Sequence, residues 1–346
     1  MTTIYATHPR YAEHDMPGHP EHAGRLQAVW KRLDETGLSA RMRRVEASPA
    51  SLELLRTVHT PAYLELLAST AAYQRLVRLD ADTYVTPASY EIALLSAGGV
   101  VDAVDAVARG DATNGLAAVR PPGHHAMPDR AMGFCLLGNI AAAARHAQQA
   151  HGLKRVLIVD YDVHHGNGTE AMFYRDPSVL FISIHQSPLY PGTGAWTDIG
   201  AGEGKGFNIN VPISPGFGDD SYSALMEQVV WRAARRFQPQ LILVSVGHDA
   251  HWTDPLASMR LTLTGYAHIA RALHQMAGEY CDGKIVFVME GGYDLDALSY
   301  GMANIARVLL GDDEIIDPLG APPDGRAEPN IAPVIELAQR IHNLSE

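Results

Sequence analysis

The 346-residue sequence is poor in cysteine, in lysine and in long apolar segments. Its two cysteines, Cys135 and Cys281, cannot form a disulfide framework, so we expect a reducing, cytoplasmic location. No stretch of 18 consecutive apolar residues occurs, and the start MTTIYATHPRY lacks the basic and apolar regions of a secretory signal. We therefore expect no membrane partner.

Positive charge is also scarce, because 39 acidic residues outnumber 27 basic ones and give a formal net charge of −12. Such a charge repels nucleic-acid phosphates and favours cationic partners, so no nucleic acid is expected as a ligand. Apolar residues make up 47% of the chain, which is typical of a globular protein with a sizeable core.

Short, continuous apolar runs indicate strands that are covered on both faces: 116–119, 155–159, 179–184, 240–246 and 284–289. Helical patterns lie between or beside these runs: 87–109, 137–150, 220–236, 262–280 and 294–310. The repeated strand and helix predict an α/β fold with three layers, α/β/α, around a central, mostly parallel sheet.

We expect a single domain over residues 1–346. The segment 311–330 is rich in proline, glycine and acidic residues and is interpreted as a surface linker. Residues 331–346 contain the amphipathic pattern IAPVIELAQRIHNL, which predicts a C-terminal helix that packs back on the body.

Polar segments follow the predicted strands, and they contain histidine, aspartate and tyrosine. They are RPPGHH (120–125), DYDVHHGNG (160–168), His185, GHDAHWTDP (247–255) and EGGYD (290–294). Because ligands of open parallel sheets bind beyond the carboxyl ends of the strands, we expect these segments to converge on one crevice.

Two of these segments supply the donor types of a metal site. Asp162 and His164 are spaced i, i+2, so they point the same way in an extended segment, and Asp249 from another strand end can complete the set. Two carboxylates and one imidazole leave an open position, as in a catalytic zinc site. The alternative is an aspartate that caps a helix beside a packed histidine.

The pair His124–His125 follows a rigid Pro-Pro-Gly turn, which favours a fixed role over a chance surface pair. A metal-activated water needs a general base, and imidazole is the usual one near neutral pH. Tyr293 follows two glycines and could donate a hydrogen bond to an oxyanion, the alternative being a half-buried core tyrosine.

Long motifs in a fixed order resemble the zinc-dependent histone deacetylase family, in particular its class II-like bacterial amidohydrolases of the arginase/deacetylase superfamily. They are RPPGHHA, MGFCLLGN, VDYDVHHGNGTE, SIHQ, YPGTG, GHDAHWTDPLASMRLT and EGGYDL. The resemblance runs from HPEHAGRL at 19–26 to the helix after Tyr293. It implies an arginase/deacetylase fold, a catalytic core at about 19–310, and one Zn²⁺ per chain, with Fe²⁺ as the alternative ion.

The resemblance also implies the activity, which is removal of acetyl or other acyl groups from lysine side chains of proteins or peptides. Asp162, His164 and Asp249 would hold the metal. His125 would be the general base and then the general acid, with Asn167 behind it as in the class II-like branch. His124, paired with Asp160, would stabilise the transition state, and Tyr293 would donate to the oxyanion.

Further positions carry over from the family to the substrate tunnel and to structural K⁺ or Na⁺ ions. Gly133, Phe134, Tyr190 and Leu256 would line the tunnel, Gly291 would offer its carbonyl to the substrate amide, and Arg25 would lie near an acetate-release pocket. One monovalent cation would lie near Asp160, Asp162, His164, Ser183 and Ile184. A second would lie near Phe173, Asp176, Val179 and Phe207.

Other readings stay open at this stage. An acetylpolyamine amidohydrolase would suit the charge of −12 and the acidic residues Glu13, Asp15 and Glu21, expected near the rim. Against it, Leu256 stands where one polyamine-specific branch has glutamate. An inactive acyl-binding relative is disfavoured by the complete set of polar groups, and an arginase by the absence of a second ligand cluster. A homo-oligomer is left open. His248 stands where the family more often has phenylalanine.

Overall fold

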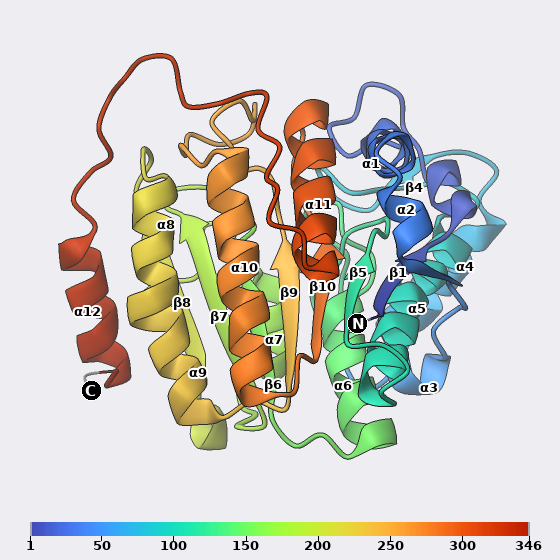
Figure 1. Cartoon of the computed structure of the whole chain (residues 1–346). Helices are drawn as coiled ribbons and strands as arrows, with labels where there is room; N and C mark the ends of the chain where they lie inside the picture. Colours follow the sequence, from blue (N-terminus) through green and yellow to red (C-terminus); the bar gives the residue numbers. More distant parts are fainter. Residues whose placement is uncertain (1, 345–346) are drawn as a thin grey trace.

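The computed structural model describes residues 2–344, which form a three-layer structure around an eight-stranded sheet (Figure 1). The strand order is β2-β1-β5-β10-β9-β6-β7-β8, and every neighbouring pair is parallel. The strands are β1 (Thr3–Thr7), β2 (Arg43–Glu46), β5 (Asn114–Ala117), β6 (Val156–Asp160), β7 (Val179–Gln186), β8 (Asn208–Ile213), β9 (Leu241–Val246) and β10 (Ile285–Met289). A separate antiparallel pair consists of β3 (Val77–Arg78) and β4 (Tyr84–Val85).

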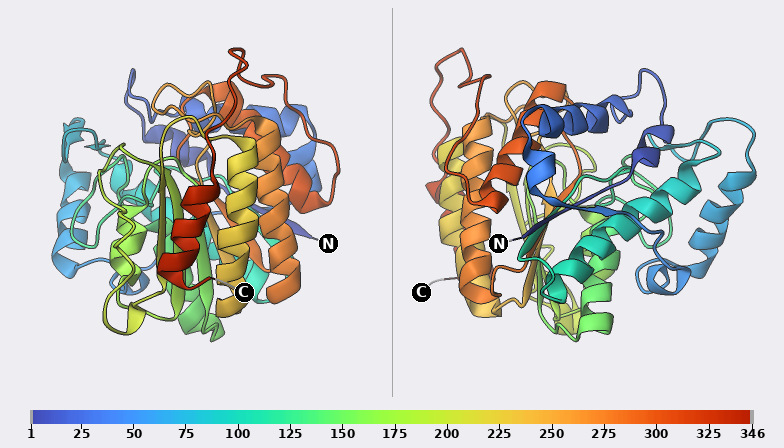
Figure 2. Two further views of the ribbon diagram at one scale, coloured as in Figure 1. Left: turned by 90° about the vertical axis from the view of Figure 1, so that its left-hand side faces the viewer. Right: turned by 45° about the vertical axis from the view of Figure 1, so that its right-hand side comes forward.

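Helices cover both faces of the sheet, and the predicted α/β/α architecture is confirmed (Figures 1 and 2). One face carries α5 (Ser89–Ala108), α6 (Asn139–His151) and α7 (Asn167–Phe173). The other carries α10 (Leu263–Tyr280), α11 (Leu295–Leu310) and a rod made of α8 (Asp219–Leu225), the π-helical turn Met226–Val230 and α9 (Trp231–Phe237). The N-terminal region adds α1 (Gly24–Glu35), α2 (Leu38–Arg41), α3 (Leu52–Leu55) and α4 (Pro61–Ser69), with short 3₁₀ turns at Pro9–Glu13, Thr70–Ala72 and Gly202–Gly204.

The five predicted strands and five predicted helical stretches are present, with ends that differ by a few residues. The largest difference is at β5, which begins at Asn114 and ends at Ala117, so the run 116–119 extends into the following loop. Three strands of the sheet were not predicted, because their sequences are not continuous apolar runs. In β8, for example, Asn208 and Asn210 alternate with apolar residues, and both amides donate to Glu170 Oε2.

The end of the chain follows the predicted course. Residues 311–330 contain no helix or strand, and α12 (Ala332–His342) then packs against β8 and the π-helical turn at one edge of the sheet (Figure 1). Arg236 Nη1 donates to the carbonyl of His342 at 2.6 Å, which ties α12 to α9. Residues 345 and 346 of the predicted C-terminal segment lie outside the described residues.

Cys135 and Cys281 are both free and buried. Among residues 2–344, no helix combines the length and apolar character needed to cross a membrane.

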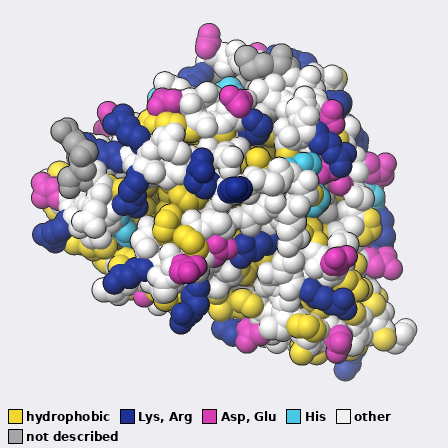
Figure 3. All heavy atoms as spheres, turned by 90° about the horizontal axis from the view of Figure 1, so that it is seen from below, with side chains coloured by type: hydrophobic (Ala, Val, Ile, Leu, Met, Phe, Trp, Pro, Cys, Tyr) yellow, Lys and Arg dark blue, Asp and Glu magenta, His cyan; other side chains and the backbone are white. Residues whose placement is uncertain are grey.

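The two ends of the sheet differ in character. Beyond the carboxyl ends of β5, β6, β9 and β10, the loops carry buried histidines and carboxylates. The other end of the molecule, seen from below in Figure 3, carries basic and acidic side chains interspersed among apolar ones. The polar loops predicted to converge are therefore on one edge of the sheet, as a parallel arrangement requires.

Candidate active site

The predicted metal ligands lie together at the centre of this edge. Asp162 and His164 follow β6, and Asp249 follows β9, which pairs directly with β6. His164 Nδ1 lies 3.1 Å from Asp162 Oδ1 and 3.2 Å from Asp249 Oδ2. One donor atom from each of the three buried residues lies within 4.8 Å of the others.

The chemistry of this donor set fits a divalent cation. Two buried carboxylates share one imidazole, and burial together with the charge of Asp162 raises the pKa of Asp249. A bound cation would offset that repulsion, since a buried unpaired charge is costly. A side chain at Gly291 would collide with both carboxylates, so glycine is required there for close approach of the backbone. The set therefore suits Zn²⁺, and Fe²⁺ also accepts such ligands.

His125 is held as a neutral base. Its Nδ1 lies 2.7 Å from Asn167 Oδ1, while the Asn167 amide nitrogen faces the sulfur atoms of Met127 and Met132. The amide oxygen can only accept, so His125 carries its proton on Nδ1 and leaves Nε2 free. Burial, and then the neighbouring charge of His124, lower the pKa of His125 well below its usual value of 6.5.

His124, in contrast to His125, is held in its charged, protonated state. Its Nδ1 lies 3.0 Å from Asp160 Oδ2, and its Nε2 lies 3.8 Å from Asp162 Oδ1. Burial disfavours the charged ring, but the carboxylates of Asp162 and Asp160 outweigh it and raise the pKa of His124 to about 10. The backbone N–H groups of Gly123 and His124 donate to Glu290 Oε2, which fixes the turn that carries both histidines.

Tyr293 is anchored from two sides. Its backbone N–H donates to Asp254 Oδ2 at 2.7 Å, and the Arg25 guanidinium lies 4.9 Å from its ring centroid. Arg25 also donates to the carbonyls of Gly292 and Glu290, at 2.7 and 2.6 Å. Burial raises the pKa of Tyr293 well above its usual value, so the phenol stays protonated and can donate.

These groups open onto a cavity of about 240 Å³. The predicted tunnel residues Gly133, Phe134, Tyr190, Leu256 and Gly291 all line it, together with His124, His125, His164 and Tyr293. Gly133 has φ 56°, and a side chain there would strike the His125 ring, so glycine is required. Arg25 is not among the lining residues and is fully buried beside the Tyr293 ring, so the acetate-release pocket expected near it stays a prediction.

Three residues that line the cavity were not predicted from the sequence: Asp82, Pro122 and Leu189. Pro122 and Leu189 flank residues that the motifs had singled out, so proximity in sequence could have found them. Asp82 had no such signal, because it comes from the β3–β4 connection, far from every motif. Asp254 and Glu290 were also missed as supports, although both lie inside motifs already quoted.

The expected acidic rim is only partly correct. Glu21 is fully buried and forms ion pairs with Arg120 and Arg25, so the prediction that it lies at the rim is wrong. Burial opposes its charge, but the Arg120 guanidinium lowers the pKa of Glu21 to about 2. Glu13 pairs with Arg10 at the surface. Asp15 alone borders a groove beside the cavity, whose lining also includes Leu256 and Tyr293.

The residues expected around monovalent cations fall into two places. Asp160 ends β6 and pairs with Ser183 of β7, which Ile184 follows. Asp162 and His164 come directly after β6. Phe173, Asp176, Val179 and Phe207 lie near the other end of β7, where Arg145 already covers the Phe173 ring and pairs with Asp176. Both cation sites stay predictions.

The surroundings of His248 explain why histidine can replace phenylalanine there. It is buried against the Tyr266 ring, with centroids 4.7 Å apart, and a side chain at Gly301 would overlap it. Neither ring nitrogen has a hydrogen-bond partner among residues 2–344, and burial lowers the pKa of His248 to about 3. It fills a core space as a neutral aromatic ring, as phenylalanine would.

Comparison with known proteins places the site in context. The histone deacetylase domain family matches residues 19–309. The chain is 45% identical over 269 residues to "Histone deacetylase 14, chloroplastic" of Arabidopsis thaliana, covering 76% of this chain and 64% of that protein. It is 40% identical over 323 residues to "Probable deacetylase" of Archaeoglobus fulgidus, covering 90% of this chain and 88% of that protein.

A bacterial relative and a solved structure extend the comparison. "Histone deacetylase-like amidohydrolase" of Pseudomonas aeruginosa is 45% identical over 243 residues, covering 70% of this chain and 64% of that protein. The crystal structure of the HDA15 HD domain has a TM-score of 0.89 and 35% identity, covering 99% of this chain and 94% of that chain. The match spans less than two thirds of the Arabidopsis and Pseudomonas proteins.

Proposed function

Because the chain belongs to the histone deacetylase family, we propose that it is a zinc-dependent amide hydrolase that removes acetyl or other acyl groups from lysine side chains. One observation carries the proposal. A neutral imidazole, a charged imidazole and a phenol border one cavity of about 240 Å³, and so does His164 of the three-ligand set. This is the set of groups that hydrolysis of an unactivated amide requires.

Each group has a separate task in the proposed reaction. Zinc held by Asp162, His164 and Asp249 would polarise the amide carbonyl and acidify a water molecule. His125 Nε2 takes the proton from the attacking water and returns it to the leaving amine as the C–N bond breaks. Charged His124 stabilises the negative charge that develops on the amide oxygen, and Tyr293 donates its phenolic hydrogen to that oxygen. The products are a carboxylate and a free lysine amine.

The shape of the tunnel supports acyl-lysine as substrate. Phe134, Leu189, Tyr190 and Leu256 give it apolar walls suited to the methylene chain of lysine. Phe134 is held edge-on by His19 and Tyr293, with ring centroids 4.7 and 6.0 Å apart. Leu256 adds apolar surface and no charge at the mouth, where a glutamate would favour a second ammonium group.

A second candidate, hydrolysis of acetylated polyamines, is favoured by Asp82. This half-buried carboxylate lines the cavity, and burial raises its pKa. It could pair with a distal ammonium, or it could accept hydrogen bonds from the backbone N–H groups of a peptide. Asp15 in the adjoining groove adds a second negative charge on the same side.

Steady-state kinetics with acetyl-lysine peptides and N-acetylated spermidine or putrescine separates the two candidates. We expect a higher kcat/KM for the peptides. Asp82→Asn should cost them less than about 10-fold, because the amide oxygen still accepts hydrogen bonds, whereas an ammonium would lose its counter-charge. A preference for acetylpolyamine that is lost in Asp82→Asn would contradict the lysine assignment.

Metal removal tests the zinc requirement. Chelation should abolish turnover, and one equivalent of Zn²⁺ at Asp162, His164 and Asp249 should restore it. Fe²⁺ is the alternative ion to test in parallel. Full turnover by a chain that holds no metal would contradict the proposal.

A further inference from the structure

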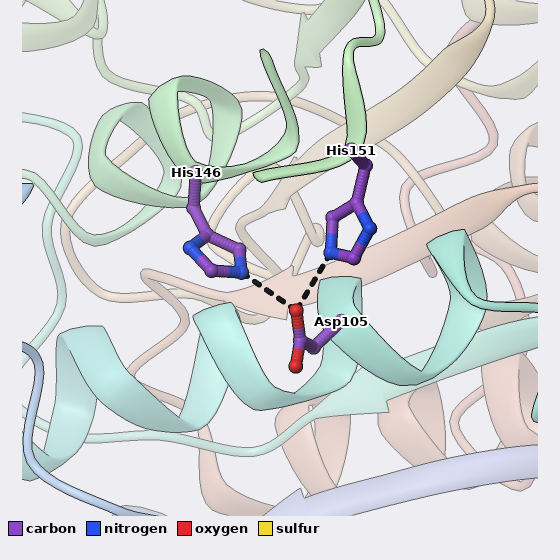
Figure 4. Close-up of side chains that lie close together, drawn as sticks. All are labelled: Asp105, His146 and His151. Atoms are coloured by element: carbon purple, nitrogen blue, oxygen red, sulfur yellow. Dashed lines mark hydrogen bonds and ion pairs between the residues drawn. The ribbon is translucent and has the colours of Figure 1, made fainter. Parts of the chain in front are cut away.

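A second cluster of metal-binding side chains lies between helices α5 and α6. Asp105 belongs to α5, while His146 and His151 belong to the last part of α6. Each histidine directs Nε2 at the same oxygen, Asp105 Oδ1, and each N···O distance is 2.7 Å (Figure 4). The centroids of the two imidazole rings are 5.5 Å apart and the ring planes make an angle of 75°, so the rings approach Asp105 from different directions.

The carboxylate is oriented from outside the cluster. Arg109, the residue that directly follows α5, binds Asp105 Oδ2 at 2.6 Å, which leaves Oδ1 facing the histidines. Such an outer partner fixes a single-oxygen ligand in the way that support groups do in known metal sites. The side chains are 21%, 23% and 13% exposed for Asp105, His146 and His151, so an ion can reach them from solvent.

We propose that Asp105, His146 and His151 form a second zinc site, separate from the catalytic one. Two imidazole nitrogens and one carboxylate oxygen are ligands that Zn²⁺ prefers, and the three donor atoms already lie within 4.8 Å of one another. Ligand atoms around a tetrahedral zinc are about 3.3 Å apart, so the 2.7 Å contacts need to widen by only about half an ångström. Water completes the coordination.

The place of the site in the fold indicates a structural role. α6 begins at Asn139, whose side-chain amide donates to the carbonyl of Pro121 in the turn before His124 and His125. The cluster lies toward the opposite end of this 13-residue helix, with His146 about 10 Å and His151 about 18 Å from Asn139 along its axis. Zinc there would join α5 to α6 far from the reacting groups, and so would stabilise the fold without entering the reaction.

Metal content tests the proposal, with Zn²⁺ alone as the probe. The purified full-length chain is saturated with Zn²⁺, passed through a desalting column and analysed for zinc and protein. We expect two equivalents per chain for the wild type and one for His146→Ala/His151→Ala. Zinc added to chain that already holds its first equivalent should raise Tm by several degrees in the wild type and not in the double variant.

Two further variants keep the result decisive. His268→Ala removes an exposed histidine from α10 and should retain both equivalents. Asp105→Asn keeps the shape of the cluster but loses its charge, and should weaken the second equivalent at least 10-fold. Equal zinc content in the wild type and the double variant, or a lower content in His268→Ala than in the wild type, would each overturn the proposal. Because the double variant should keep kcat within about two-fold, this outcome is independent of the proposed hydrolase activity.

Discussion

At the scale of single residues, Asn167 determines which nitrogen of His125 holds the proton. Its amide oxygen accepts from Nδ1, and its amide nitrogen is turned toward two methionine sulfur atoms. A carboxylate at this position would favour the charged form of His125, whereas the neutral amide does not. The protein therefore keeps one neutral histidine beside a charged one, with ring centroids 4.0 Å apart.

This arrangement predicts the pH dependence of turnover. The proposed base, His125, works only when neutral, and its lowered pKa keeps it neutral well below pH 6.5. Asn167→Asp adds a negative charge, raises that pKa and should move the acid limb of kcat/KM to higher pH. Profiles of both proteins at saturating zinc measure the shift, with Glu53→Gln, an exposed residue of α3, as a control. An unchanged limb would mean that another group titrates there.

Tyr293 gives a second prediction at this scale. Tyr293→Phe removes one donor to the developing oxyanion and should lower kcat by about 100-fold or more. The ring keeps its contacts with Arg25 and Phe134, so Tm and zinc content should stay unchanged. Tyr280→Phe, which alters a phenol near Trp231 instead, serves as the matched control. Turnover within a few-fold of wild type would exclude Tyr293 as the donor.

At the scale of elements, the loop after β9 positions the start of α11. Asp254 accepts from the backbone of Tyr293 and Asp294 through Oδ2, and from Leu256 through Oδ1 at 2.9 Å. One carboxylate thus connects Leu256 of the cavity wall to Tyr293, the proposed oxyanion donor. Burial, and then the charge of Asp249, raise the pKa of Asp254 to about 7.

Removal of this connection should affect the reaction more than binding. Asp254→Ala leaves buried N–H groups without an acceptor, which costs about 1–3 kcal/mol of stability, and it frees Tyr293 to move. We expect kcat to fall at least 10-fold with a smaller change in KM. Asp254→Asn should restore part of the loss, and Asp296→Ala, an exposed residue on α11, should change neither constant. A rise in KM alone would assign Asp254 to substrate binding.

At the scale of the whole molecule, burial makes many histidines neutral. Their pKa values are lowered chiefly by desolvation, to about 3 for His14, His185 and His248 and to about 4 for His59, His251 and His342. His59 shows why neutrality is needed, because its Nε2 accepts from Gly138 N and its Nδ1 faces the carbonyl of Met127.

The lowered pKa values of these buried histidines predict that the free energy of unfolding decreases in acid. Each binds a proton near pH 6.5 when unfolded but only near pH 4 or below when folded, so stability is full above pH 6.5 and falls as pH decreases toward 4. For His59 the loss is about 3 kcal/mol. Urea unfolding in EDTA from pH 7.5 to 4.5 should show it, and His59→Gln should reduce the slope relative to His268→Gln. A pH-independent free energy of unfolding would contradict this.

The whole molecule also bears on domain organisation. We propose that the chain is one domain, because α12 packs back against the edge strand β8 after the long segment 311–330. Segment 311–330 is itself attached to the body, because Asp324 accepts from Arg260 Nη1 at 2.9 Å and from Nη2 at 2.6 Å.

The sequence by itself determined the central strands, the layers and the meeting of Asp162, His164 and Asp249. Apolar runs such as 155–159 and 240–246 can only be buried, and parallel strands must end at the same edge, so the aspartates and histidines after them had to meet. Spacing within one segment was enough to pair Asp162 with His164. These features follow from short-range patterns and from the geometry common to all parallel sheets.

Only the tertiary structure decided the rest. β8 lacks a continuous apolar run, and a distant residue, Glu170, satisfies its buried asparagines. The burial of Glu21 depends on Arg120, which lies 99 residues away, and nothing near either residue reveals the pair. Asp82 at the cavity and the joining of Asp105 to His146 and His151 likewise arise from the packing of distant elements. A charge is buried or exposed according to its partner, and that partner is known only once the chain has folded.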